Sequence, residues 1–314
     1  MTSQPGRLGV GVVGAGRVGA VLGSALRAAG HAVVGASGIS AASRERIATM
    51  LPGVPALEVQ EVVERAELVL LTVPDDALAD LVSGLAALGA WQPGQIVVHT
   101  AGAFGISVLA PARAAGVIPL AIHPAMTFTG TSLDISRLVG CSFAVTGPAP
   151  VLPIGQALVV EVGGEPVVVA EEARPLYHAA LAHGANHLVV LVAQAAHALA
   201  AAGVEAPDRV LGPLLGAALD SAVRGAGGLG TDGPVGAGVA GLTGPVVRGD
   251  TGTVTAHLSE LTLLAARDPG AADLAPAYRV LARSATTRAL AGGRITTVQA
   301  ERLLDVLSET QGDA

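Results

Sequence analysis

The sequence contains no lysine, and all 18 of its basic residues are arginine. A catalytic lysine, whether it forms a Schiff base or transfers a proton, is therefore excluded. Cys141 is the one cysteine, so the chain has neither an internal disulfide nor a cluster of metal-binding thiolates. We expect Cys141 to be a small buried apolar residue. Aromatic residues make up only 2% of the chain, so Ala, Val and Leu must form the core.

Charge is scarce as well. Charged residues make up 14% of the chain, against about 25% in an average domain, while 51% of the residues are apolar. The net charge of −7 argues against nucleic acid and against an anionic membrane surface as partners. A chain of 314 residues is long for one domain and comfortable for two.

The segment from Pro175 to Val204 carries no formal charge, and its length raises the question of a membrane span. It contains polar side chains that are costly in lipid, namely His178, His183, Asn186, His187, Gln194 and His197. We therefore expect a fully buried helix of a soluble domain. Arg17 interrupts the apolar run near the N-terminus, so we expect no signal peptide and a cytoplasmic location.

The chain opens with "LGVGVVGAGRVGAVLGSALRAAGHAVVGAS". The pattern predicts a strand over Leu8–Val13, a helix over Arg17–Ala29 and a strand over Ala32–Ala36. The turn between the first two is G-x-G-x-x-G, which is typical of dinucleotide-binding sites when strand, helix and second strand follow in this order. The alternative is a glycine-rich turn beside an empty crevice.

Each glycine of the motif has a separate physical role. Gly14 permits the tight turn, Gly16 lets the backbone approach a pyrophosphate, and Gly19 allows close contact of helix and sheet. The helix N-terminus then faces the phosphates. The predicted cofactor contacts in this turn are Gly14, Ala15, Gly16, Arg17, Val18 and Gly19.

The end of the second strand indicates which dinucleotide binds. An NAD site places Asp or Glu there, whereas this chain has Ser37, followed by Ser40, Ser43, Arg44 and Arg46. Hydroxyls and a guanidinium suit the 2′-phosphate of NADP. We predict NADP, with NAD less favoured, and contacts from Ser37, Ser43 and Arg44. The alternative is that Arg44 and Arg46 form a solvated helix face.

The alternation of strand and helix continues. Strands are predicted over Leu68–Val73 and in two segments that end at His99-Thr100 and at His123-Pro124. Asp75 or Asp76 begins the intervening helix, more as a cap than as a catalyst. The polar residues at the strand ends should lie at the ligand-binding edge of a parallel sheet. Predicted cofactor contacts there are Val73, Pro74 and Thr100.

The same edge supplies the first candidate catalytic residue. We predict that His123 contacts the substrate or the nicotinamide, and the alternative is a turn histidine held by backbone groups. The same two alternatives apply to His99.

The pattern changes near Phe143. "SFAVTG" and "ALVVEVGGEPVVV" predict short strands that finish the first domain, and almost everything from Glu171 onward predicts helix. The fold class is therefore an α/β Rossmann-type parallel sheet (residues 1–170) followed by an all-helical domain (residues 171–314). The first helix runs to about Ala202, and further helices are predicted over Pro207–Arg224, Thr251–Ala266, Ala271–Leu290 and Thr297–Glu309. Gly225–Pro245 is a glycine-rich segment of the kind that is either disordered or functional.

The long first helix carries candidate site residues. At about 100° per residue, His178, Ala182 and Asn186 form one stripe. We predict that His178 and Asn186 face the crevice between the domains, with a satisfied polar pair in helix packing as the alternative. His183 and His187 have the i, i+4 spacing of metal ligands, but no acidic residue lies nearby, so no metal is predicted.

A second candidate segment is "LTGPVVRGD", Leu242 to Asp250. Gly244-Pro245 predicts a turn, and Asp250 is placed to cap the following helix. We predict that the turn presents Arg248, together with Thr243, to substrate or cofactor. The alternative is an Asp cap with a solvated Arg.

The order of G-x-G-x-x-G, "VPDDAL", "HTAGAFG", "IHPAMTF", "YHAALAHGANHLVVL" and "LTGPVVRGD" resembles a family of bacterial Rossmann-like proteins with a helical C-terminal domain of unknown function. That family is similar to pyrroline-5-carboxylate reductase, ketopantoate reductase and the 6-phosphogluconate and β-hydroxyacid dehydrogenases. The resemblance implies an NADP-linked oxidoreductase. One departure matters, because the β-hydroxyacid dehydrogenases use a lysine in the helical domain and this chain has none.

We therefore predict an NADP-dependent oxidoreductase that acts on a small carboxylate-bearing carbonyl, imine or hydroxy acid bound between the two domains. His178 supplies the proton, Asn186 orients the acceptor and Arg248 anchors the anionic group, with His123 and Asp250 as further catalytic candidates. Reduction of a protonated imine would mainly require hydride geometry. The alternatives are a non-enzymatic NADPH-binding regulatory protein and a structural protein. A homodimer through the helical domain is expected.

Overall fold

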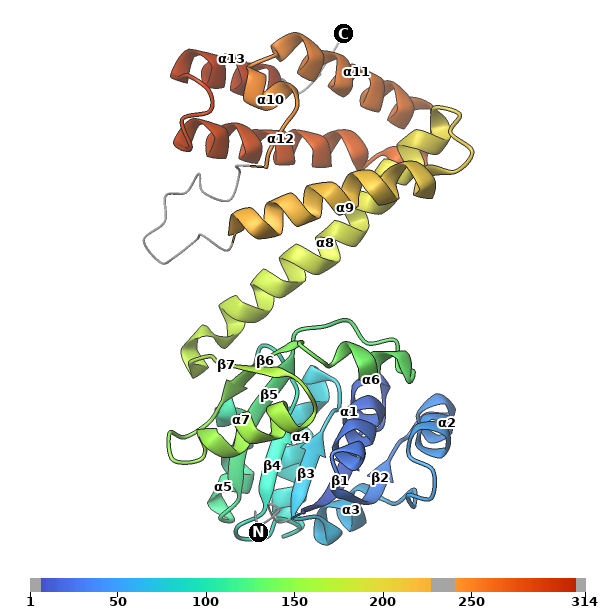
Figure 1. Cartoon of the computed structure of the whole chain (residues 1–314), viewed down its shortest axis with the longest axis vertical. Coiled ribbons are helices and arrows are strands. Elements are labelled where there is room, and N and C mark those ends of the chain that lie inside the picture. Colours follow the sequence, from blue (N-terminus) through green and yellow to red (C-terminus); the bar gives the residue numbers. More distant parts are fainter. Residues whose placement is uncertain (1–6, 227–240, 309–314) are drawn as a thin grey trace, which may run out of the picture. The chain divides into compact units, whose positions relative to one another are not determined.

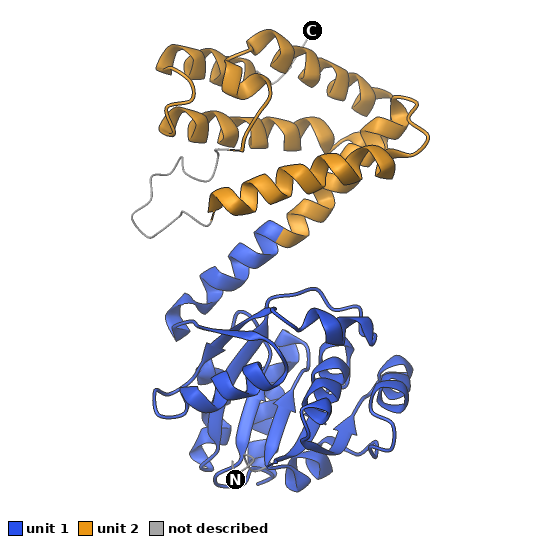
Figure 2. Ribbon diagram, viewed as in Figure 1, with its two compact units in different colours: residues 1–184 blue, residues 185–314 orange. Residues whose placement is uncertain are grey.

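The computed structural model describes residues 7–226 and 241–308. The chain divides into two compact units, residues 1–184 and residues 185–314 (Figure 2). Most of the predicted glycine-rich segment Gly225–Pro245 lies outside the described residues.

A seven-stranded sheet forms the centre of the first unit, with strand order β2-β1-β3-β4-β5-β6-β7. Its strands are β1 (Gly9–Val13), β2 (Ala32–Ser37), β3 (Leu68–Leu71), β4 (Ile96–His99), β5 (Ile118–Pro124), β6 (Ser142–Thr146) and β7 (Glu165–Val168). All neighbouring strands are parallel except β5 and β6. The Rossmann-type α/β fold predicted from the sequence is confirmed, and its sheet is mostly parallel, with the antiparallel pair β5 and β6 as the departure.

Helices cover both faces of this sheet (Figure 1). They are α1 (Arg17–Ala28), α2 (Ala41–Met50), α3 (Val59–Arg65), α4 (Asp75–Ala87), α5 (Ala110–Ala114), α6 (Leu133–Arg137) and α7 (Leu152–Glu161), with 3-10 turns η1 (Ile106–Leu109) and η2 (Glu171–Ala173). One core lies between the sheet and α1 and α7, and the other lies under α3, α4 and α5. In β3, Leu68 and Leu70 enter the first core while Val69 and Leu71 enter the second. This explains why the strands are apolar without alternation.

One predicted strand is wrong. The stretch "ALVVE", expected to be extended, forms the end of helix α7, and only Glu165–Val168 of that region is a strand. Leu158 and Val159 of α7 are buried in the first core, and Gly155 lets the helix approach Val145 of the sheet closely. A short, continuously apolar run suits a covering helix as well as a buried strand, so periodicity alone could not separate them.

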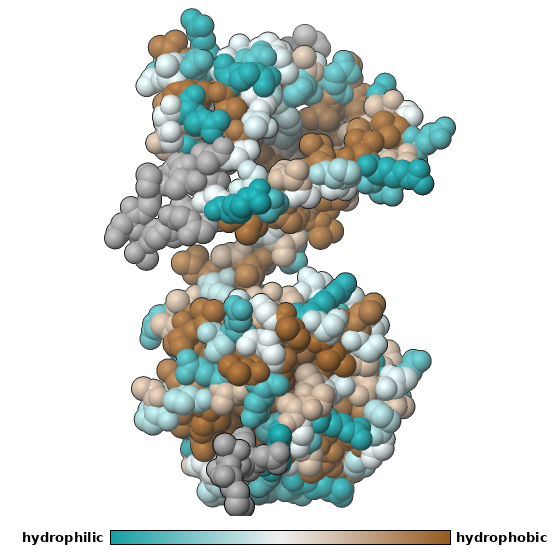
Figure 3. Space-filling model, in the orientation of Figure 1, coloured by the Kyte–Doolittle hydropathy of each residue, from teal (hydrophilic) through white to brown (hydrophobic). Residues whose placement is uncertain are grey.

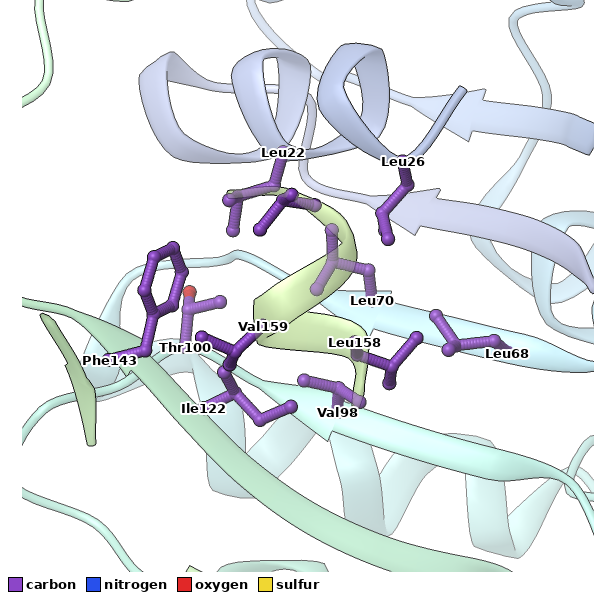
Figure 4. A pocket seen from close by; sticks show the side chains of 11 residues that line it. Leu22, Leu26, Leu68, Leu70, Val98, Thr100, Ile122, Phe143, Leu158 and Val159 are labelled. Carbon is purple, nitrogen blue, oxygen red and sulfur yellow. The ribbon is translucent and has the colours of Figure 1, made fainter. Parts of the chain in front are cut away.

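A small void remains in the first core, between α1, α7 and the sheet (Figure 4). It measures about 30 Å³, and its walls are almost wholly apolar. Leucines, valines, an isoleucine and a phenylalanine surround it, and the hydroxyl of Thr100 is the one side-chain oxygen among the labelled residues. An apolar space of this size is a packing defect that stays dry, and we do not assign a ligand to it.

The second unit is helical, as predicted. Helix α8 (Arg174–Ala201) begins in the first unit and continues into the second, where it is followed by α9 (Pro207–Ala226), α10 (Pro245–Arg248), α11 (Thr251–Arg267), η4 (Pro269–Ala271), α12 (Leu274–Ala291) and α13 (Thr297–Ser308). Gly203, at φ +88°, follows the end of α8, as the sequence predicts. Val254, Ala289, Leu303 and Leu307 are fully buried in the core of this unit.

The expectation that the long helix is fully buried is wrong. By length and composition, Glu171–Ala201 is apolar enough to cross a membrane, but none of its most apolar window is buried within the chain. Leu188, Val189, Val190 and Leu191 of α8 are between 36% and 69% exposed. An apolar composition indicates that a helix packs against other apolar surface, but it does not show whether that surface belongs to the same chain.

Candidate functional site

The G-x-G-x-x-G turn connects β1 to α1. Gly14 has φ +88°, a conformation that favours glycine, and the amide of Ala15 donates to the carbonyl of Ser37 at 2.7 Å. The hydroxyl of Ser37 accepts a hydrogen bond from the Gly14 amide at 3.2 Å. Ser37 therefore holds the turn against the end of β2.

Gly19 and Gly16 of the turn face different surroundings. A Cβ at Gly19 would lie 2.2 Å from Thr72 Oγ1 and 2.5 Å from the carbonyl oxygen of Gly14, so only glycine lets α1 sit this close. A Cβ at Gly16 would meet nothing nearer than the Gly14 oxygen at 3.9 Å. Gly16 is also the N-cap of α1 and makes no side-chain cap bond. The start of α1 therefore presents amides and a positive dipole end to open space, as an anion site requires.

The polar side chains after β2 either cap helix α2 or carry positive charge. Ser43 is buried, and its hydroxyl donates to the Ser40 carbonyl while its amide donates to the Ser40 hydroxyl, so the two serines cap α2. Arg44 is exposed and its guanidinium donates to the carbonyl of Ile39. The side chain of Arg46 packs with Arg17 around Gly130, whose Cβ position lies 3.0 Å from Arg46 Nε and 2.9 Å from Arg17 Cγ. Arg44 and Arg46 therefore follow β2 on helix α2, and Arg17 lies beside Arg46.

The Gly130 loop is anchored by a carboxylate that the sequence did not mark. Asp134 is fully buried and accepts hydrogen bonds from the amides of Thr129 and Gly130, each at 2.7 Å, and from the Thr129 hydroxyl. Burial raises the pKa of Asp134, but these hydrogen bonds outweigh it and hold the pKa below its ordinary value. Asp134 is therefore an ionised anchor for the loop that contacts Arg17 and Arg46.

The predicted contacts Val73, Pro74 and Thr100 follow β3 and β4. Val73 packs near Gly14, since its Cγ1 lies 3.0 Å from the Gly14 Cβ position, and the Thr100 amide donates to Leu71 at 3.2 Å. Helix α4 begins at Asp75, as predicted, but its N-cap is Pro74 and no side chain caps it. Asp75 and Asp76 therefore lie in the first helical turn, where negative charge is favourable, and are not caps.

A cluster of ring side chains lies where β5 meets the start of α8. His123 Nδ1 and the hydroxyl oxygen of Tyr177 are 3.0 Å apart and share a hydrogen bond. The His123 ring stands edge-on to Tyr177 and to His178, with centroids 5.6 Å and 5.7 Å away. The structure thus brings together the predicted His123 and His178. It adds Tyr177, which the motif contains and which was not predicted as a site residue.

Gly102 makes room for this cluster. A Cβ at Gly102 would lie 2.1 Å from His178 Nδ1 and 3.0 Å from His123 Nε2. Gly102, the first glycine of "HTAGAFG", therefore lets both imidazoles approach the backbone that follows β4. His178 Nδ1 is buried and has no hydrogen-bond partner within the part of the chain that the structure describes.

Arg174 lies beneath the cluster and is fully buried. Its guanidinium donates to the carbonyls of Ala101, Ala121 and Ala144 and its Nε donates to the Thr146 hydroxyl, at 2.7–3.3 Å. Among described residues, no carboxylate forms an ion pair with it. Burial lowers its pKa to about 10, so it stays charged near neutral pH. Arg174 is a fixed cation that links strands β5 and β6 to the segment that follows β4.

This cation and burial keep two histidines neutral. Burial, followed by the charges of Arg174, His178 and His99, lowers the pKa of His123 to about 4. Burial also lowers the pKa of His99 to about 4, although its bond to the Gly105 carbonyl opposes this shift. His99 Nε2 donates to that carbonyl at 2.8 Å, and His99 Nδ1 has no hydrogen-bond partner among the described residues.

The other predicted catalytic residues belong to the second unit. Asn186 lies on α8, Arg248 ends α10, and Asp250 caps α11 by accepting from the amide of Thr253 at 3.0 Å and from its hydroxyl at 2.7 Å. The bonds from Thr253 hold the pKa of Asp250 below its ordinary value. The predicted cap is therefore present, and its carboxylate is engaged within the helix start.

The second unit also contains an apolar pocket of about 570 Å³, lined by parts of α8, α10, α11 and α12. A second histidine and tyrosine pair, His257 and Tyr278, lies on its wall with a hydrogen bond of 2.9 Å. Over residues 7–226 and 241–308, no group of three or more His, Cys, Asp or Glu side chains is arranged to hold a metal ion.

Comparison with known proteins matches both halves of the chain. Residues 2–124 match the model of a Rossmann-like domain, and residues 141–285 match that of a domain of unknown function, DUF2520. The expected resemblance to Rossmann-like proteins with a C-terminal domain of unknown function is therefore confirmed. No curated protein matches the chain.

Solved structures share the fold along most of the chain. A presumed NADP oxidoreductase from Bacteroides fragilis is 22% identical, with 88% of this chain and 97% of that chain covered and a TM-score of 0.68. An imine reductase from Pseudomonas sp. is 17% identical, with 96% and 100% covered and a TM-score of 0.62. An imine reductase from Myxococcus stipitatus, in complex with NADP⁺, is 17% identical, with 94% and 99% covered and a TM-score of 0.58. At these identities the likeness establishes the fold.

Proposed function

We propose that the protein is a nicotinamide-dinucleotide-dependent oxidoreductase. The observation that carries the proposal is the pairing of two features at one edge of one sheet. Gly16 opens the start of α1 beside β1, and the neutral His123 cluster lies at the end of β5. Strands β1 and β5 are three spacings apart, roughly 14 Å at ~4.8 Å per strand, which is a span suited to an extended dinucleotide. Ligands of open α/β sheets bind along this carboxyl edge.

The proteins of similar fold support the same conclusion. The Bacteroides fragilis protein is named for NADP-linked oxidoreduction, and the Myxococcus stipitatus imine reductase was solved with NADP⁺. A variant of the latter was solved with NAD⁺, so this fold accepts both dinucleotides.

For this chain we propose NADP as the cofactor. Ser37 stands where an NAD site would place a carboxylate, and its hydroxyl is engaged by Gly14. Arg44 and Arg46 follow the end of β2 and Arg17 lies beside Arg46, so a 2′-phosphate there would meet positive charge. When bound, the dinucleotide supplies the hydride.

The proposed substrate is a small carbonyl, imine or hydroxy acid that bears a carboxylate. The His123 cluster offers neutral hydrogen-bonding groups for the reacting oxygen or nitrogen. In this proposal, Arg248 anchors the carboxylate and Asn186 orients the acceptor, because an arginine fork matches a carboxylate and an amide can donate to a carbonyl.

Calorimetric titration with NADPH and with NADH tests the cofactor part of the proposal. We expect wild-type protein to bind NADPH more tightly than NADH. Gly16→Ala should weaken binding at least tenfold, since its Cβ enters space that the protein leaves open, while stability changes by no more than about 1 kcal/mol. Gly84→Ala is the matched control, because a Cβ at Gly84 meets nothing within 4 Å and Gly84 lies on helix α4, away from the turn.

Arginine variants distinguish the binding of NADPH from the binding of NADH. Arg46→Ala and Arg44→Ala should each weaken NADPH binding several-fold and leave NADH binding unchanged, since only NADPH carries the 2′-phosphate. Absence of binding by wild-type protein would overturn the proposal. Binding without oxidation by any carbonyl or imine would favour a non-enzymatic NADPH-binding protein.

We further propose that two copies pair through the helical unit in the cytoplasm. The exposed apolar residues of α8 supply a surface that requires cover. The single free thiol of Cys141 is compatible with a reducing compartment.

A further inference from the structure

We propose that Tyr177 is the catalytic residue that donates the proton during reduction, and that His123 positions it by donating Nδ1–H to the phenolic oxygen. This inference rests on the proposed function and deepens it. It starts from the 3.0 Å bond between His123 Nδ1 and the Tyr177 oxygen at the carboxyl end of β5. In the required tautomer, the phenol O–H is free to point at a substrate.

His123 cannot itself be the acid. Burial and the charge of Arg174 lower its pKa to about 4, so its imidazole is neutral near pH 7 and has no excess proton to give. A neutral imidazole can still donate one N–H. Directed at the Tyr177 oxygen, that N–H stabilises the anion that remains after proton transfer.

His178 is a weaker candidate for the same step. Its Nδ1 is buried and packs against Gly102, 2.1 Å from the position of a Cβ there. Both residues are half-buried, but that nitrogen lies against the backbone of Gly102, whereas the hydrogen bond from His123 to the Tyr177 oxygen leaves the phenolic proton free. His178 therefore forms a wall of the cluster and fixes the His123 ring edge-on.

Arg174 supports Tyr177 from below. Burial raises the pKa of Tyr177, so the phenol keeps its proton at neutral pH, and the Arg174 charge opposes part of that rise by favouring the anion. The charged groups that shift the pKa of His123 are Arg174, His178 and His99. Those that shift the pKa of Tyr177 are Arg174 and Cys141. Because Arg174 is fully buried and held by four acceptors, its charge needs no reorganisation during the reaction.

Reduction adds one hydride and one proton to the substrate. A bound, reduced dinucleotide would supply the hydride that forms a C–H bond at the carbon of the substrate C=O or C=N, whose π bond breaks. The Tyr177 O–H bond breaks and a new O–H or N–H bond forms on the substrate. Tyr177 is left as a phenolate, which takes up one proton from bulk solvent, and the dinucleotide would be left oxidised.

The first experiment compares Tyr177→Phe with Tyr278→Phe. Tyr278 is the chain's other tyrosine and bonds His257 in the same way, 2.9 Å apart, so it is a matched control. Steady-state rates are measured with NADPH and a panel of 2-oxo acids and neutral cyclic imines, using the acceptor that wild-type protein reduces fastest. We expect kcat of Tyr177→Phe to fall about 10²–10⁴-fold with the KM for NADPH unchanged, and Tyr278→Phe to match wild type.

The outcomes separate this inference from the proposed function. A fall in kcat of less than tenfold for Tyr177→Phe, in an enzyme that is active as wild type, overturns the inference and leaves the proposed function standing. Absence of hydride transfer by wild-type protein across the panel overturns both.

A second experiment tests the His123 contact without any substrate. In the Tyr278→Phe background Tyr177 is the sole tyrosine, so the ultraviolet absorbance of tyrosinate reports it alone. His123→Leu should raise the pH of half-ionisation, because the Nδ1–H donor is lost. His123→Gln should restore part of the difference, because its amide can donate. An unchanged titration in His123→Leu overturns the positioning role.

Discussion

At the residue scale, His99 makes the stability of the first unit sensitive to acid. Its pKa is about 4 in the folded protein against an ordinary value of 6.5, because burial disfavours the charged ring. Between these values the unfolded chain binds a proton that the folded chain does not. The stabilisation is therefore complete above pH 6.5 and is lost as pH falls toward 4, with a limit of roughly 3 kcal/mol for a shift of this size.

Chemical denaturation at a series of pH values measures this effect. The free energy of unfolding should fall with pH between 6.5 and 4 in wild-type protein, and the slope should be smaller in His99→Gln. Glutamine can still donate to the Gly105 carbonyl and does not titrate. Equal slopes in the two proteins would contradict the assignment.

Gly102 gives a second prediction at the same scale. Gly102→Ala places a methyl group 2.1 Å from His178 Nδ1 and 3.0 Å from His123 Nε2, so the imidazoles must move. We expect kcat to fall at least tenfold while NADPH affinity in calorimetry stays within a factor of three. Gly84→Ala, which meets nothing within 4 Å, should change neither quantity. Full activity in Gly102→Ala would show that the cluster tolerates displacement.

The site was only partly predictable from these residues. Gly14 and Gly19 could be assigned because turn geometry and close packing leave a local signature in the sequence. His123 was predicted because it ends an apolar strand, and His178 because it shares one stripe of the long helix with Asn186. Tyr177 and Arg174 were missed as site residues because their roles depend on contacts with β5, β6 and the segment after β4, up to 73 residues away in sequence. No periodicity encodes such contacts.

At the scale of elements, prediction succeeded where short turns define the ends of a segment. β1, α1 and β2 lie within one residue of their predicted bounds, and β4 ends at His99 as predicted, since glycine or a polar residue marks these boundaries. The end of α7 was mistaken for a strand, because its apolar run fits either conformation. The exposure of α8 was missed, because an apolar segment does not reveal which surface covers it.

The loop between β5 and α6 gives the prediction that belongs to this scale. Asp134→Ala leaves the amides of Thr129 and Gly130 without their acceptor, so the free energy of unfolding should fall by about 2–4 kcal/mol. Because Gly130 packs against Arg17 and Arg46, NADPH affinity should fall as well. Denaturant titration and calorimetry measure the two effects, and Asp76→Ala, in an exposed first turn, should show neither. Unchanged NADPH affinity in Asp134→Ala would separate the loop from the cofactor site.

At the scale of the whole molecule, the unburied α8 determines the assembly that we expect. Apolar side chains gather along α8 and α9 in the space-filling view (Figure 3). Val189 and Val190 are 69% and 50% exposed on a helix that continues through uncovered residues. Contiguous apolar surface of this kind marks an interface more often than a free face. We expect a second copy to cover it, since closed two-fold dimers are the commonest assemblies.

Sedimentation equilibrium tests this expectation with matched variants. Wild-type protein should sediment as a dimer at micromolar concentration, and Val189→Glu with Val190→Glu should shift the equilibrium toward monomer at least tenfold, because two carboxylates would be buried unpaired. Leu133→Glu is the control, since Leu133 of α6 is 67% exposed and belongs to the first unit. A monomeric wild type would contradict the dimer. Co-sedimentation of that monomer with phosphatidylcholine vesicles would instead identify lipid as the cover for α8.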